Sequence, residues 1–139
     1  MIYRVLIVED NKDLNEMFQI ALADEKIFQT ESLFDGRMAL EKALKFKPNL
    51  ILLDIMMPHE NGYEVLKKLR QHPLLKKTIV VVNSNMEQQR DEDKALLLGA
   101  DFYLRKSEYA PSQLIQKIKS ILIAEKGKSI LMKGVHVGV

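Results

Sequence analysis

The 139-residue chain contains no cysteine. A disulfide framework, a thiolate nucleophile and a cysteine-ligated zinc site are therefore excluded, and a reducing cytosol suits such a chain. No apolar stretch reaches the roughly 20 residues that a membrane-spanning helix needs. We expect a cytoplasmic protein that is neither secreted nor inserted in a membrane.

An excess of charge of one sign is also absent, because 21 Lys and Arg residues are balanced by 19 Asp and Glu residues. The formal net charge of +2 gives no argument for nucleic acid or an anionic membrane as the main partner. His59, His72 and His136 lack metal-ligand spacing, and neither common Gly-rich phosphate loop occurs. These absences argue against a histidine metal site and a nucleotide-phosphate loop.

The apolar residues predict five strands alternating with five helices in one domain, for which 47% hydrophobic residues supply an ample core. The second strand is expected at a sheet edge because it is more polar. Strict alternation favours a parallel sheet with helices on both faces, since parallel neighbours need helical crossovers. The predicted strands span residues 3–8, 28–34, 49–54, 79–82 and 102–104.

Polar residues follow four of these strands, at the end where such sheets bind ligands. Glu9 and Asp10 follow the first strand and Asp54 ends the third, while Ser84 and Lys106 follow the fourth and fifth. Each acid alone is usually a helix cap or a solvated loop residue. Three carboxylates crowded at one rim, however, repel one another unless a cation is present. Mg²⁺ fits best, because it binds carboxylates and keeps a position for a phosphate oxygen.

Asp54 is the expected nucleophile of this site. A carboxylate can accept a phosphoryl group as an aspartyl phosphate, and the transfer depends mainly on positioning and charge neutralisation. Lys106 would pair its charge with the phosphoryl group, and Ser84 would donate its hydroxyl to another phosphoryl oxygen. The residues therefore predict a magnesium-dependent phosphoacceptor site.

Residues 3 to about 124 resemble the receiver domain of two-component response regulators, particularly single-domain chemotaxis and sporulation regulators. The matching features are Glu9-Asp10 after Val-Leu-Ile-Val, Asp54-Ile55-Met56-Met57-Pro58 with Gly62, Ser84 placed 30 residues after Asp54, and Lys106 placed 22 after Ser84. The resemblance implies a doubly wound, flavodoxin-like (βα)5 fold, whose five-stranded parallel sheet has the order 2-1-3-4-5.

The resemblance also implies the reaction and its partners. Asp54 would take a phosphoryl group from a sensor histidine kinase, a histidine phosphotransfer protein or a small phosphodonor. Mg²⁺ would be bound by Glu9, Asp10, Asp54 and the backbone carbonyl of Met56. Beyond phosphorylating and dephosphorylating itself, the chain would not be an enzyme.

The family's switch places Ser84 toward the phosphoryl group while an aromatic residue, here Tyr103, turns inward. Phosphorylation would then shift a two-state equilibrium. A downstream protein target would bind the surface of the fourth helix, fifth strand and fifth helix, with no direct contact to nucleic acid. The formation of a homodimer through the same surface is a further possibility.

Two positions depart from the family pattern. Ser107 follows Lys106 where proline is usual, and we expect a trans bond because a non-proline cis bond costs about 2.5–4 kcal/mol. Asn85 replaces a small residue and is either a solvated loop residue or part of the site mouth. Met56 and Met86 are apolar where they flank the path of the attacking water, which suggests slow self-dephosphorylation.

We expect a receiver domain over residues 1–125 and a tail over residues 126–139. The alternating Val135, Val137 and Val139 could form an edge strand, and the alternatives are a frayed, disordered terminus or the start of a linker. Two other functions are considered. One is a receiver-like binding module that phosphorylation does not regulate. The other is an aspartate-nucleophile phosphohydrolase, which would need a second carboxylate where Met56 stands and a covering cap.

Overall fold

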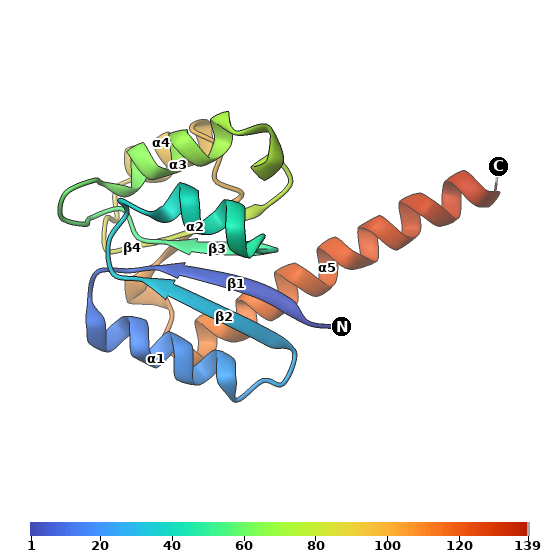
Figure 1. The fold of residues 1–139 in the computed structure, drawn as a ribbon, viewed down its shortest axis with the longest axis horizontal. Helices are drawn as coiled ribbons and strands as arrows, with labels where there is room; N and C mark the ends of the chain where they lie inside the picture. Colours follow the sequence, from blue (N-terminus) through green and yellow to red (C-terminus); the bar gives the residue numbers. More distant parts are fainter. Residues whose placement is uncertain (139) are drawn as a thin grey trace.

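Five parallel strands form one sheet in the predicted order β2-β1-β3-β4-β5 (Figure 1). The computed structural model describes the backbone of residues 1–138 and the side chains of residues 1–128. Each strand is followed by a helix, so the predicted alternation is confirmed. The elements are β1 Tyr3–Val8, α1 Lys12–Ala23, β2 Phe28–Leu33, α2 Ala39–Phe46, β3 Leu50–Leu53, α3 Gly62–Gln71, β4 Ile79–Ser84, α4 Gln89–Leu97, β5 Phe102–Arg105 and α5 Pro111–Gly138, with short 3-10 turns at Pro73–Leu75 and Lys106–Glu108.

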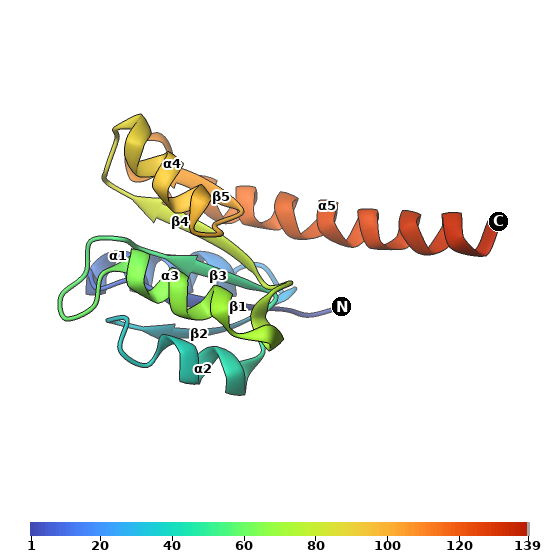
Figure 2. The ribbon, with the colours of Figure 1, turned by 90° about the horizontal axis from the view of Figure 1, so that it is seen from above.

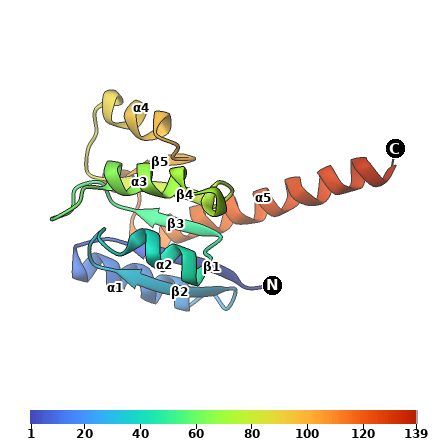
Figure 3. The same ribbon diagram turned by 45° about the horizontal axis from the view of Figure 1, so that its top comes forward.

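Helices cover both faces of the sheet, with α1 and α5 on one face and α2, α3 and α4 on the other (Figures 1 and 3). Alternate strand residues point to opposite faces. In β1, Val5 and Ile7 therefore pack under α1 and α5, whereas Leu6 and Val8 pack under α2 and α3. Two apolar layers thus hold the sheet between the helices.

The position of each strand in the sheet explains its composition. Every residue of β3 is buried, because β3 lies in the centre with neighbours on both sides. In β2 no residue is fully buried, and its polar residues fit the predicted sheet edge. The apolar run that leads to Asp54 is therefore a central strand.

Two asparagines and one glycine determine where the helices near the carboxyl ends of the strands begin. The side chains of Asn11 and Asn61 accept hydrogen bonds from the backbone at the starts of α1 and α3, over 3.0 and 3.1 Å. The Gly62 N–H donates to the Ile55 carbonyl over 2.7 Å. A Cβ at Gly62 would overlap the Asp54 carbonyl, so only glycine lets α3 begin this close to β3.

The tail continues α5 as far as Gly138 and projects beyond the sheet (Figure 2). An edge strand over residues 126–138 is therefore wrong. Lysine, leucine and methionine in this segment favour helix and no proline interrupts it, although its three glycines do not favour helix. The domain boundary at residue 125 and the linker start stay predictions, and Val139 lies outside the described residues. Within residues 1–138, no helix is long and apolar enough to cross a membrane.

Candidate functional site

The carboxyl ends of β1 and β3 bring the three predicted acids together. Oxygen atoms of Glu9, Asp10 and Asp54 all lie within 4.8 Å of one another. The Glu9 N–H donates to the Leu33 carbonyl over 3.1 Å, and the Asp54 N–H donates to the Val8 carbonyl over 2.9 Å. Neighbouring strands therefore position the acids, of which Glu9 and Asp54 are only 2% and 4% exposed.

Lys106, at the end of β5, bridges two of these carboxylates. Its Nζ lies 2.7 Å from Glu9 Oε1 and 3.4 Å from Asp54 Oδ2. Removing Lys106 would leave the two buried carboxylates without this compensating charge, at a cost of about 3–5 kcal/mol. In this arrangement Lys106 pairs more closely with Glu9 than with the expected nucleophile.

The surroundings of Asp54 disfavour its ionised form. Burial, followed by the negative charge of Glu9, raises the pKa of Asp54 from 3.8 to about 8, although the charge of Lys106 opposes the shift. One lysine therefore does not neutralise this group of acids. An additional cation would favour the ionised carboxylate, which is the nucleophilic form.

The two predicted switch residues are joined through the backbone of Met86. Its N–H donates to Ser84 Oγ over 3.1 Å, and its carbonyl accepts the Tyr103 hydroxyl over 2.6 Å. Ser84 and Tyr103 are both buried, so Tyr103 points inward here. Burial raises the pKa of Tyr103, which therefore stays a hydroxyl donor. A shift of the loop after β4 would disturb both residues together.

The remaining predicted residues differ in how far they are buried. Asn85 is exposed, Met86 is half-buried against the α2 and α3 side of the core, and the Met56 side chain is 63% exposed. A contact from the Met56 carbonyl to a metal stays a prediction. The Lys106–Ser107 peptide bond is trans, as expected.

Sequence reasoning missed two asparagines that contact Glu9. The Asn11 N–H donates to Glu9 Oε2 over 3.0 Å, and Asn15 Nδ2 donates to the Glu9 carbonyl over 3.0 Å. Asn15 precedes Phe18 by three residues and Leu22 by seven, so it shares their face of α1. The sequence could have indicated Asn15, because it is a polar residue on an otherwise apolar face of the helix.

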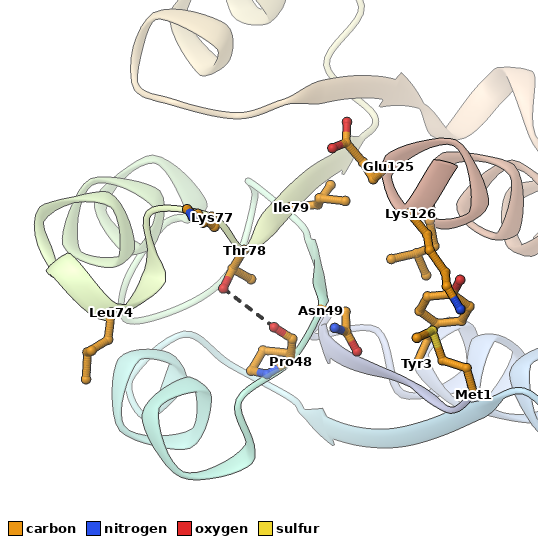
Figure 4. Close-up of a pocket in the computed structure, with 11 residues that line it drawn as sticks. Met1, Tyr3, Pro48, Asn49, Leu74, Lys77, Thr78, Ile79, Glu125 and Lys126 are labelled. Carbon is orange, nitrogen blue, oxygen red and sulfur yellow. Dashed lines mark hydrogen bonds between the residues drawn. The ribbon is translucent and has the colours of Figure 1, made fainter. Parts of the chain in front are cut away.

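A pocket at the opposite end of the sheet contains none of the predicted site residues (Figure 4). Tyr3, Asn49 and Ile79, at or beside the amino ends of β1, β3 and β4, line this pocket together with Glu125 and Lys126 of α5. The acids lie at the carboxyl ends, so the pocket is separate from them.

Comparisons with known proteins agree with this geometry. A family model described as the response regulator receiver domain matches residues 5–119. Response regulator ArlR of Staphylococcus aureus is 31% identical over 128 residues, which are 92% of this chain and 56% of ArlR. The chain thus spans about half the length of the curated relatives that it matches.

Solved structures show the same fold. Chemotaxis protein CheY4 of Vibrio cholerae matches with a TM-score of 0.79 and 27% identity, over 86% of this chain and 98% of CheY4. The Mn²⁺-bound form of response regulator Rcp1 matches with a TM-score of 0.75 and 31% identity, over 85% of this chain and 92% of Rcp1. The chain belongs to the response regulator receiver domain family, whose members signal in two-component systems through phosphorylation.

Proposed function

We propose that Asp54 accepts a phosphoryl group from a sensor histidine kinase or a histidine phosphotransfer protein in a Mg²⁺-dependent reaction. The main support is the group of three carboxylate side chains and Lys106 at the carboxyl ends of the strands. A single acid there could be a helix cap, but three acids within 4.8 Å of one another and one lysine form a site for a cation and an anion. A cytoplasmic location is part of this proposal.

The donor set fits a hard divalent cation. Carboxylate oxygens are ligands that Mg²⁺ prefers, and Glu9, Asp10 and Asp54 would supply them together with the predicted Met56 carbonyl. Rcp1, a solved receiver, has a Mn²⁺-bound form. When bound, the cation would neutralise the charge of the acids and of the phosphoryl oxygens.

The chain's own residues would carry out the transfer by positioning. An Asp54 carboxylate oxygen forms a bond to phosphorus as the bond from phosphorus to the donor's histidine nitrogen breaks. That electron pair stays on the imidazole. Lys106 Nζ, 3.4 Å from Asp54 Oδ2, is near enough to pair with the transferred group after a small movement. Ser84 would donate its hydroxyl to a second phosphoryl oxygen.

The switch would pass from Ser84 to α4 through the loop after β4. A movement of Ser84 toward the phosphoryl group would disturb its hydrogen bond with Met86, and Tyr103 is bonded to that same backbone. Helix α4 is only lightly anchored, since Ala95 is its one fully buried residue. We therefore place the surface for a downstream protein, or for a second copy, on α4, β5 and α5.

The proposal is tested by incubating the chain with a small acyl phosphate and measuring its intact mass. With Mg²⁺, the wild type should gain the mass of one phosphoryl group, whereas wild type with a chelator and Asp54→Asn with Mg²⁺ should gain none. After the acyl phosphate has been removed, the phosphorylated chain should release no more than one phosphate per molecule, since we propose no other enzymatic activity. No gain by the wild type would instead favour a receiver-like module that only binds.

A further inference from the structure

Asn15 has a fully buried amide whose atoms all have partners. Its Nδ2 donates to the Glu9 carbonyl over 3.0 Å and to the Leu33 carbonyl over 3.1 Å. Its Oδ1 accepts a hydrogen bond from Gln19 Nε2 over 2.7 Å. Carbonyl oxygens only accept hydrogen bonds, so the nitrogen must face Glu9 and Leu33. The orientation of the amide is thereby determined, and it joins α1 to the ends of β1 and β2.

Every polar group of Glu9, namely its N–H, its carbonyl and its carboxylate, has a partner, and Asn15 is the partner of the carbonyl. The Glu9 N–H donates to Leu33, its carbonyl accepts from Asn15, and its carboxylate contacts the Asn11 N–H and Lys106 Nζ. Rotating the Glu9 peptide would break the Asn15 bond and turn the carboxylate away from Lys106. The Asn15 amide therefore opposes that rotation from inside the core.

The location of Asn15 argues that this contact has a role beyond packing. It lies on the face of α1 where Phe18 and Leu22 are buried among apolar residues. Placing an amide on such a face costs free energy unless its hydrogen bonds are made. An apolar residue would pack there without that requirement, but it could not hold the Glu9 carbonyl.

We propose that Asn15 is a positioning residue for the cation-binding acids. Its amide holds the backbone of Glu9 so that the Glu9 carboxylate stays beside Asp10, Asp54 and Lys106. The proposal rests on the proposed function, because it assigns Asn15 to that same site. Residues that orient a metal ligand without touching the metal typically change metal affinity 10- to 100-fold when replaced.

The test compares Asn15→Leu, which keeps the approximate size of the side chain, with Leu22→Ala. Leu22 is buried on the same helix among apolar residues, so its variant controls for a weakened α1. Amide hydrogen exchange of residues 9–11 is measured in the metal-free proteins, and Mg²⁺ affinity is measured by titration. Should Asn15→Leu fail to fold, Asn15→Ala is compared by the same criteria.

Relative to Leu22→Ala, we expect Asn15→Leu to exchange its Asn11 amide hydrogen faster and to bind Mg²⁺ about 10-fold more weakly. Equal exchange and equal affinity in the two variants would overturn the proposal and leave Asn15 a purely structural residue. If the wild type binds no Mg²⁺, the proposed function fails, while exchange at residues 9–11 still decides whether Asn15 holds Glu9.

Discussion

In the metal-free protein, replacing Asp54 with asparagine should increase the free energy of unfolding. Asp54 is 4% exposed and lies beside Glu9, and its pKa is raised to about 8, chiefly by burial. Each unit between the folded and unfolded pKa corresponds to 1.36 kcal/mol. From 3.8 in the unfolded chain, keeping this carboxyl buried at pH 7 costs about 4 kcal/mol. Asparagine has nearly the same shape and carries no charge.

The net gain is smaller than this cost, because the new amide needs partners. An unsatisfied buried amide costs about 1–3 kcal/mol, so we expect Asp54→Asn to be more stable by about 1–3 kcal/mol at pH 7. The folded pKa of Asp54 lies above its unfolded value. Below pH 3.8 the carboxyl is neutral in both the folded and the unfolded chain, and burying it carries no ionisation cost. As the pH rises from 3.8 to about 8, this cost grows and lowers the free energy of unfolding of the wild type. The advantage of the variant should accordingly grow from acidic to mildly alkaline pH.

Urea unfolding followed by far-UV circular dichroism checks this prediction, with both proteins in a chelator at acidic, neutral and mildly alkaline pH. Saturating Mg²⁺ should then stabilise the wild type far more than the variant, by about 2.7 kcal/mol at 100 times Kd. A variant less stable than the wild type at alkaline pH, or an advantage that does not change with pH, would refute the reasoning.

Three further substitutions test other parts of the account. Gly62→Ala should lower the free energy of unfolding by about 2 kcal/mol or more in urea unfolding, because its Cβ would overlap the Asp54 carbonyl. Tyr103→Phe removes the bond to the Met86 carbonyl and should cost about 1 kcal/mol by the same assay, and an unchanged stability would show that this bond contributes nothing. Mass spectrometry over time should show that the phosphoryl group on Asp54 persists for minutes or longer. Met86→Gln should shorten that time by placing an amide beside the attacking water, whereas a lifetime of seconds that Met86→Gln leaves unchanged would contradict slow self-dephosphorylation.

Much of the fold and the grouping of the acids follow from local sequence. The apolar run Leu50–Leu53 could only be buried, and β3 is indeed buried at every residue. Because parallel strands end at the same edge of a sheet, the polar residues after β1, β3 and β5 had to lie close together. Glu9, Asp54 and Lys106 are therefore in contact, as expected.

The contacts of Lys106 and Asn15 and the conformation of the tail depend on three-dimensional packing, which the spacing of residues along the sequence does not determine. Lys106 has a long side chain with several rotamers, and only the packed structure shows its closer contact with Glu9. Asn15 joins β1 and β2 through hydrogen bonds across up to 18 residues of sequence, so no local pattern names its partners. The alternating valines of the tail left an edge strand open among other possibilities, but residues 126–138 continue α5.

The most direct test of the central claim is to locate the phosphoryl group after the wild type reacts with a small acyl phosphate and Mg²⁺. Borohydride reduces an aspartyl phosphate to homoserine, which peptide mass spectrometry then places in the sequence. The account predicts homoserine at residue 54 and unmodified aspartate at residue 10. Reduction at Glu9 or Asp10, or none at Asp54 in protein that has gained a phosphoryl group, would contradict it.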